Sequence, residues 1–306
     1  MKHTINVTLL FILMFFISNL LGLYLLNISM QSIENFNGTS KIVYSSTTIG
    51  DRAEVSGWES LVYIALGITI GTFILLYFVK RKKVNWWKTW FFIAAAVSMS
   101  VAFGTLFGPN FFLGSWILSF VLAYVKIFRF NSLVHNFTEI IMYAGIAVLF
   151  VPILNVQVMI VLLAFISLYD ALAVWKSKHM VKMARFTSDA SVFPGLSLQY
   201  DQDKKVSENL LLYKNKKTLK SSVKTGILGG GDVVFPLLFN GVLMSHLILL
   251  GILPSLAFLY SLIPIFVCSL ALFGLFWFGK KNRFYPAMPF LSLGCLVGFF
   301  IVFFIV

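Results

Sequence analysis

Charged side chains are scarce in this sequence, and that scarcity excludes most soluble folds. Asp, Glu, Lys and Arg together make up 11% of the residues, and hydrophobic residues make up 59%. A typical soluble domain carries about 25% charged residues. Cysteine is equally rare: Cys268 and Cys295 are the only two, and both lie inside apolar runs, with no metal-ligand spacing and no disulfide framework. We expect two buried apolar side chains there, no metal site and no cofactor.

Long apolar runs take the place of the missing charge. No alternating barrel pattern occurs, so the spans must be helices that satisfy their own backbone hydrogen bonds in lipid. At roughly 20 residues per span, the runs predict an all-α polytopic membrane protein with about nine transmembrane helices. The first run is too long for a signal-peptide core and is expected to stay as a helix. The predicted spans lie near residues 7–28, 58–79, 89–107, 111–128, 138–154, 156–175, 225–246, 253–279 and 286–306.

These spans predict one membrane domain over residues 1–306 with three parts. A six-helix amino-terminal part covers 1–175, a cytoplasmic loop covers 176–224, and a three-helix carboxyl-terminal part covers 225–306. The start of the loop, KSKHMVKMARF, places its apolar residues on one helical face and predicts a short interfacial helix. Beyond Thr187 the loop is polar and is expected to be mobile.

The basic residues predict the orientation of the chain in the membrane. All but two of the 24 Lys and Arg residues fall on one side of the predicted spans; the exceptions are Lys41 and Arg52. Under the positive-inside rule, the amino end is cytoplasmic and the carboxyl end external, which agrees with an odd number of spans. The net charge of +13 sits beside the spans, so we expect anionic membrane lipid, and no nucleic acid, as its partner. The predicted location is the cell membrane.

Two aspartates, Asp170 and Asp232, lie inside the predicted spans. The other nine acidic residues, Glu139 among them, are expected in connections or at helix mouths. Charged residues deep in a membrane segment usually face a water-filled cavity and take part in the function of the protein. By helical rise, Asp170 lies about 9 Å from Lys176 and Asp232 about 12 Å from Lys224, so both have similar depth. Two facing carboxylates share a proton and can hold a water that attacks an amide carbonyl.

Glycine and proline mark two further segments near this depth. Gly229, Gly230 and Gly231 lead into Asp232, and they weaken a helix and allow close backbone approach. The segment Tyr285-Pro286-Ala287-Met288-Pro289 opens the last predicted span. Within a helix, Pro289 would free the carbonyl of Tyr285, and this backbone would then need another partner.

Together these motifs resemble the presenilin and signal peptide peptidase family of intramembrane aspartyl proteases. Tyr169-Asp170 is similar to the family's Tyr-Asp motif, and Gly229-Gly230-Gly231-Asp232 to its Gly-x-Gly-Asp motif. Pro286-Ala287-Met288 resembles its Pro-Ala-Leu motif, with Met in place of Leu. The resemblance extends to the whole predicted arrangement of spans, including the nine helices and the long sixth connection.

The resemblance implies a function and a site. Asp170 and Asp232 would be the catalytic pair of an aspartic endopeptidase that cleaves transmembrane segments or signal peptides. Tyr169, the three glycines and Pro286 to Met288 would position the substrate. The cytoplasmic amino end resembles presenilins, and the compact length resembles prokaryotic, mainly archaeal, members, which are thought to act without accessory subunits.

Two alternatives stay open at this point. An ion-coupled transporter or channel also uses paired acids, although no inverted repeat is visible. A prepilin-peptidase-like aspartyl protease shares the Gly-x-Gly-Asp motif, but has fewer spans and usually a basic residue soon after the aspartate, where this chain has Val233 and Val234. A zinc or rhomboid-like serine site is disfavoured, because no His-Glu-x-x-His occurs and His246 is expected to be the only deep histidine.

Overall fold

Nine membrane-spanning helices dominate the computed structural model, which describes residues 5–36, 39–51, 57–81, 83–129, 131–176, 192–201, 223–279 and 285–306. Within these ranges, nine helical segments are long and apolar enough to cross a membrane, which confirms the predicted polytopic architecture. The helices are α1 (Ile5–Ser29), α2 (Trp58–Arg81), α3 (Val84–Phe107), α4 (Phe112–Phe128), α5 (Ser132–Phe150), α6 (Val156–Ala171), α9 (Gly230–Leu249), α10 (Pro254–Phe278) and α11 (Met288–Ile305). Short helical turns extend three of them: 3₁₀ turns at Pro109–Phe111 before α4 and Val151–Ile153 after α5, and a π-helical turn at Leu172–Lys176 after α6.

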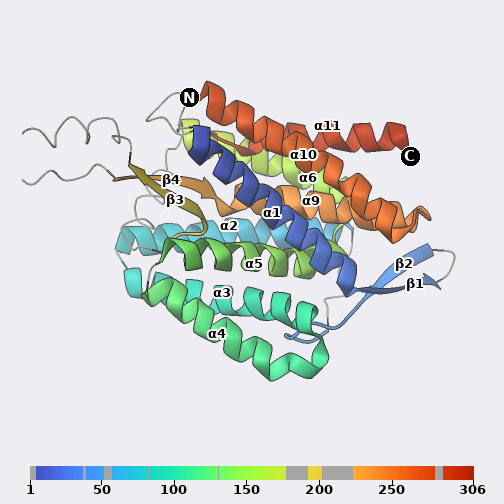
Figure 1. The fold of residues 1–306 in the computed structure, drawn as a ribbon, viewed down its shortest axis with the longest axis horizontal. Coiled ribbons are helices and arrows are strands. Elements are labelled where there is room, and N and C mark those ends of the chain that lie inside the picture. The colour runs from blue at the N-terminus through green and yellow to red at the C-terminus, as the bar shows by residue number, and fades with distance from the viewer. Residues whose placement is uncertain are drawn as a thin grey trace, which may run out of the picture.

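The helices run along one common direction, and the chain enters and leaves the bundle at opposite ends. Figure 1 shows the start of α1 at the end of the bundle opposite to the end of α11. This arrangement agrees with an odd number of crossings. Which end faces the cytoplasm stays a prediction from the charge distribution.

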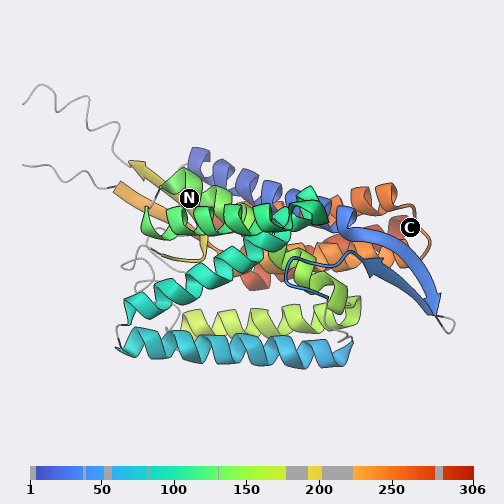
Figure 2. The ribbon, with the colours of Figure 1, turned by 90° about the horizontal axis from the view of Figure 1, so that it is seen from below.

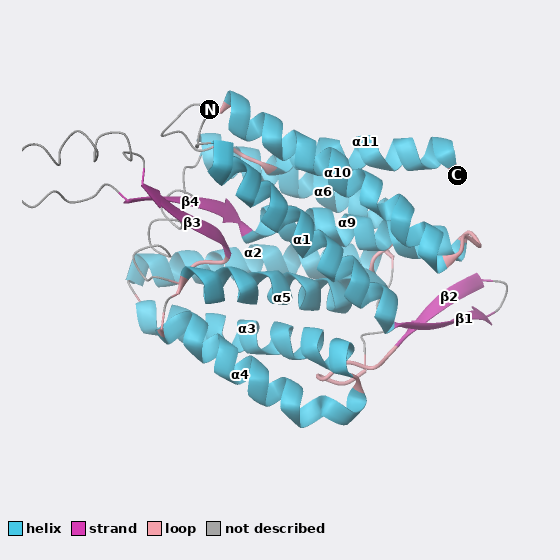
Figure 3. Cartoon of the chain, in the orientation of Figure 1, coloured by secondary structure: helices cyan, strands magenta, loops and turns pink. Residues whose placement is uncertain are grey.

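Two antiparallel hairpins, which the sequence did not reveal, lie at opposite ends of the bundle. β1 (Met30–Phe36) pairs with β2 (Thr39–Tyr44), and β3 (Gly195–Asp201) pairs with β4 (Val223–Gly229). Figure 3 shows the first hairpin near the end of α1 and the second near the start of α9. The predicted cytoplasmic loop, residues 176–224, therefore contains β3 and the start of β4. The predicted interfacial helix falls almost entirely on residues 177–186, outside the described part of the chain.

β4 also corrects the predicted start of the seventh span. The sequence predicts a helix from residue 225, but α9 begins at Gly230, because the apolar residues Ile227 and Leu228 belong to β4. The helical rise from Lys224 therefore does not measure the depth of Asp232. Asp232 instead lies in the first turn of α9.

The apolar core consists of two clusters that meet at α5. The larger cluster joins α1, α5, α6 and the three carboxyl-terminal helices, and the smaller joins α3, α4 and the other face of α5. α5 and α9 are consequently the most enclosed of the described spans. α2 is peripheral, with Ser60 as its one buried residue, and Figure 2 shows it beside α6 at an outer edge.

The two cysteines lie in this core, as predicted. Cys268 on α10 and Cys295 on α11 are both fully buried free thiols, and their Sγ atoms are 3.3 Å apart. A thiol buried in this way packs as a small apolar group. The pair therefore marks a close contact between the last two helices.

Candidate active site

Asp170 is held at the carboxyl end of α6 by the start of α11. Its side chain is 5% exposed, and its Oδ2 accepts a hydrogen bond of 3.2 Å from the backbone N–H of Met288. Three residues earlier, the Ser167 hydroxyl donates to Ser292 at 2.7 Å, which fixes the register of α6 against α11. The π-helical turn begins two residues after Asp170, and such turns are frequent at functional sites.

Asp232 is half-buried in the first turn of α9, where the positive end of the helix dipole favours a carboxylate. The preceding glycine leaves the space that this carboxylate needs. A Cβ at Gly229 would lie 3.1 Å from Asp232 Oδ2, which is tighter than ordinary van der Waals contact. Gly229 therefore leaves room for the side chain three residues later in the chain, and a Cβ there would make the Asp232 carboxylate shift slightly.

The helices that carry the three predicted motifs pack against one another. α6 contacts α9 and α11, and α9 contacts α11. The structure therefore brings the Asp170 segment directly onto the Met288 segment, and packs α9, which carries Asp232 in its first turn, against both helices. The expectation that Asp170 and Asp232 act as one site stays a prediction.

The start of α11 differs from the prediction. The sequence predicts a span from residue 286 in which Pro289 frees the carbonyl of Tyr285. The helix begins instead at Met288, with Ala287 as its N-cap. Pro289 is then the second helical residue, where the missing N–H breaks no helical hydrogen bond. Pro286, Ala287 and Met288 are all buried, so this segment forms a wall beside Asp170.

Tyr169, the residue before Asp170, points to helix α2 and not to the start of α11. Its hydroxyl donates a hydrogen bond of 3.2 Å to Thr72 Oγ1 on α2, and its side chain is half-buried. Tyr169 therefore links the peripheral helix α2 to the helix that carries Asp170. This is an important link, because α2 makes few other contacts with the bundle.

Two polar residues that the sequence did not single out attach the second hairpin to α5. His135 Nε2 lies 2.8 Å from the carbonyl oxygen of Gly195, and the Asn136 side chain bonds both the N–H and the carbonyl of Ser197, at 2.8 and 2.7 Å. His135 is 2% exposed, whereas His246, the histidine that the sequence singled out, is exposed on α9. These bonds place β3 and β4 beside the start of α9.

A buried ion pair corrects the expected position of Glu139. The sequence places Glu139 at a helix mouth, yet its side chain is fully buried on α5, 2.7 Å from Lys126 Nζ on α4. Lys126 is 2% exposed, so it does not act as a free basic residue of the membrane surface. The hydropathy pattern gave no sign of this pair, because each residue lies near the end of an apolar run.

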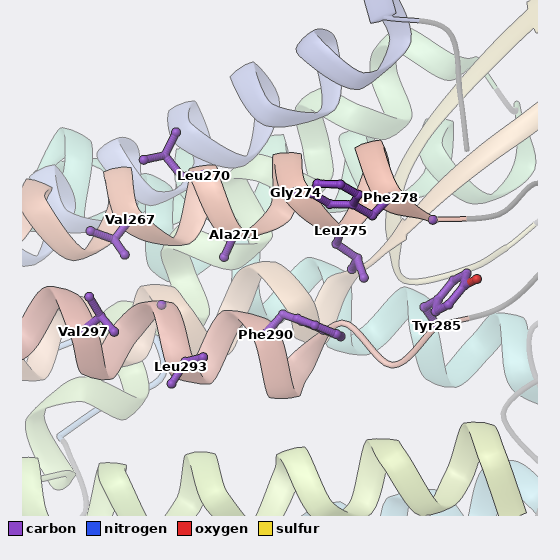
Figure 4. Close-up of a pocket in the computed structure, with 12 residues that line it drawn as sticks. Val267, Leu270, Ala271, Gly274, Leu275, Phe278, Tyr285, Phe290, Leu293 and Val297 are labelled. Carbon is purple, nitrogen blue, oxygen red and sulfur yellow. The ribbon is translucent and has the colours of Figure 1, made fainter. Parts of the chain in front are cut away.

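A separate apolar cavity of about 560 Å³ opens between α10 and α11. Figure 4 shows Val267 and Val297 pointing toward one another across it, with Tyr285 at one end. Neither Asp170 nor Asp232 lines this cavity. The cavity is therefore separate from both aspartates.

Comparisons with known proteins agree with this architecture. A family model described as signal-peptide peptidase, presenilin aspartyl protease matches residues 10–306. No curated protein matches the chain. A solved structure of a presenilin family intramembrane aspartate protease in space group C222 is similar with a TM-score of 0.60 and 16% identity, covering 98% of this chain and 99% of that one. A second such structure, in space group P2, has a TM-score of 0.58 and 17% identity, with 97% of each chain covered.

Proposed function

Because the chain belongs to the signal-peptide peptidase and presenilin family of aspartyl proteases, we propose that Asp170 and Asp232 are its catalytic pair. Family membership makes the protein an intramembrane aspartyl protease, a multi-pass membrane enzyme that acts on transmembrane substrates. The observation that carries the residue assignment is the hydrogen bond from the Met288 N–H to Asp170. It joins two of the three motif segments at one point, and the helix of Asp232 packs against both.

The proposed reaction is general acid–base hydrolysis of a peptide bond. One carboxylate removes a proton from a water held between the pair, and the water attacks the carbonyl carbon of the substrate. The other carboxyl group protonates the departing amine. The Met288 N–H donates to one oxygen of Asp170 and keeps this carboxylate in place for the reaction.

The substrate must unwind before it reacts, because a helix holds its carbonyls in hydrogen bonds to the residue four positions later. We propose that the unwound strand pairs with backbone near Pro286 to Pro289 and near β4, as an added strand. Two features support this route. Residues 285–287 lie outside any helix or strand, and β4 leads directly into the turn that carries Asp232.

Tyr169, Gly229, Gly230, Gly231, Pro286, Ala287 and Met288 are proposed to shape the substrate site. Three further properties belong to the same proposal: residues 1–306 act as one membrane domain, no accessory subunit is required, and the enzyme resides in the cell membrane with its amino end in the cytoplasm. The compact chain and the asymmetric distribution of Lys and Arg support them.

The test uses the purified protein and a single-span peptide substrate, with mass spectrometry of the products. We expect cleavage within the apolar segment by the protein alone. Asp170→Asn and Asp232→Asn should each lower turnover by roughly 10²–10⁴-fold, because each removes one acid–base group while keeping the size of the side chain. Asp51→Asn is the matched control, since Asp51 is exposed in a connection outside the spans.

Near-native turnover in either Asn variant at position 170 or 232 would show that the pair is not catalytic. Loss of activity in Asp51→Asn as well would indicate damage unrelated to the pair. Ion flux into liposomes that depends on both aspartates, without any cleavage product, would favour the transporter alternative.

A further inference from the structure

The buried ion pair leaves one of its atoms without a partner. Lys126 Nζ binds Glu139 Oε1 at 2.7 Å and Thr138 Oγ1 at 3.1 Å. The second carboxylate oxygen of Glu139, Oε2, is buried and has no hydrogen-bond partner among the described residues. Buried ion pairs are tolerated when further hydrogen bonds satisfy their remaining atoms. A buried carboxylate oxygen of this kind calls for a polar group close by.

A second buried polar group lies one helical turn away. Tyr143 follows Glu139 by four residues on α5, so both side chains occupy the same face of the helix. The residue is 2% exposed, and its hydroxyl makes no close, well-aligned hydrogen bond within the described part of the chain. This hydroxyl interacts most strongly with the carboxyl group of Glu139, which is near enough for a loose hydrogen bond, and more weakly with the carboxyl group of Asp232. It thus stands between the buried ion pair and one proposed catalytic residue.

Gly230 makes the space for this hydroxyl at the start of α9. A Cβ at position 230 would lie 3.1 Å from Tyr143 Oη and 3.3 Å from Tyr143 Cε1, which is tighter than ordinary contact. Gly230 occupies the open position of the Gly-x-Gly-Asp motif, so the motif itself does not demand glycine there. Its backbone N–H also donates to the carbonyl oxygen of Pro194 at 3.3 Å, which fixes this turn beside β3.

We propose that Tyr143 is a positioning residue for Asp232, and that its hydroxyl connects the Lys126–Glu139 pair to the Asp232 carboxyl group. The proposal rests on the catalytic role proposed for Asp232. A tyrosine hydroxyl donates one hydrogen bond and also accepts. It accepts from Asp232 and donates to Glu139 Oε2 when Asp232 carries a proton, and it donates to Asp232 when Asp232 is ionised. One hydroxyl therefore orients Asp232 in both protonation states of the reaction.

Two other titratable groups, on α5 and on α6, which packs against α9, stay unchanged in the test. His135, on α5, is bound to the Gly195 carbonyl oxygen at 2.8 Å. Asp170, on α6, is bound to the Met288 N–H. A change in pH dependence that follows removal of the Tyr143 hydroxyl alone is therefore assigned to the hydroxyl.

The test compares Tyr143→Phe with Tyr44→Phe in the cleavage assay. Tyr143→Phe removes one hydrogen bond to a charged group, so we expect kcat to fall about tenfold while KM holds, and one limb of the pH profile to move by about one pH unit. Tyr44→Phe is the matched control, because its hydroxyl binds Ser245 at 2.9 Å near the other end of the same helix, α9. Its kcat and pH profile should equal those of the wild type.

Gly230→Ala gives a second route to the same result, since its Cβ displaces the Tyr143 hydroxyl without removing it. If Tyr143→Phe does not fold, Gly230→Ala must show the shifted limb, and an unshifted profile there overturns the proposal. A folded Tyr143→Phe with wild-type kcat and pH profile, or with a lower kcat but an unmoved profile, also overturns it. Failure of the catalytic pair itself is recognised separately, because Asp232→Asn would then remain active.

Discussion

The backbone N–H of Met288 donates to Asp170 Oδ2 over 3.2 Å, and this bond joins the last turn of α6 to the first turn of α11. Since the donor is a backbone group, Met288→Leu should keep the bond. Leu and Met have similar volumes, so we expect the free energy of unfolding to change by under about 1.5 kcal/mol. Thermal unfolding in detergent checks this expectation.

Pro286→Ala should do more damage to activity than to stability. The proline fixes φ two residues before Met288, and alanine releases that restraint beside Asp170. We expect turnover to fall severalfold and the cleavage position to spread, with a small change in melting temperature. Turnover and product masses are measured for Pro286→Ala and, beside it, for Met288→Leu. If Pro286→Ala has the turnover and the product masses of the wild type, then Pro286 to Met288 serve only as the start of a helix.

The Lys126–Glu139 pair should be more sensitive to single than to double substitution. Lys126→Met or Glu139→Gln alone leaves the partner group buried and unpaired, which typically costs about 3–5 kcal/mol. The combined variant removes both charges, so it should recover part of this loss. Unfolding of the four proteins in detergent completes a double-mutant cycle. Additive losses would show that the two charges act independently despite their 2.7 Å separation.

Gly145→Ala should separate α3 from α5. A Cβ at Gly145 would overlap the backbone carbonyl oxygen of Ser98, and backbone atoms cannot move aside like a flexible side chain. Overpacking of this kind costs about 1–3 kcal/mol. Gly67→Ala on α2 is the control, because no atom outside its own helix lies within 4 Å of the added carbon. A melting temperature equal to that of the control would contradict the close packing.

Activity should follow a bell-shaped dependence on pH. Two coupled carboxyl groups must share one proton, so activity is lost both when the pair is fully protonated and when it is fully ionised. The two apparent pKa values belong to the pair. The value of kcat/KM is measured across the acidic and neutral range with one substrate. A flat profile would count against general acid–base catalysis by the pair.

Substrates with weaker helices should be cleaved faster. Glycine near the scissile bond weakens a helix by about 1 kcal/mol relative to alanine, so it lowers the cost of unwinding. Paired peptides with Gly or Ala at the same position are compared at equal binding. Equal rates would mean that unwinding does not limit the reaction.

The sequence alone determined the number and approximate position of the spans, because hydrophobic length is a local property. It also identified Asp170, Asp232 and the Pro286 segment, since a charge or a proline inside an apolar run is conspicuous without any knowledge of its neighbours. Their assembly through α6, α9 and α11 followed from the resemblance of the motifs to those of a family.

Only the tertiary structure decided which residues pair as strands and which polar side chains are buried in the core. Residues 225–229 read as helix by hydropathy but form β4, because β3 supplies their partners from a distant part of the chain. Glu139 read as a surface charge but is buried, because Lys126 on a neighbouring helix neutralises it. The space for the Tyr143 hydroxyl depends on Gly230, which lies 87 positions later in the sequence. Such pairings need contacts between distant segments, and hydrophobic periodicity records only local ones.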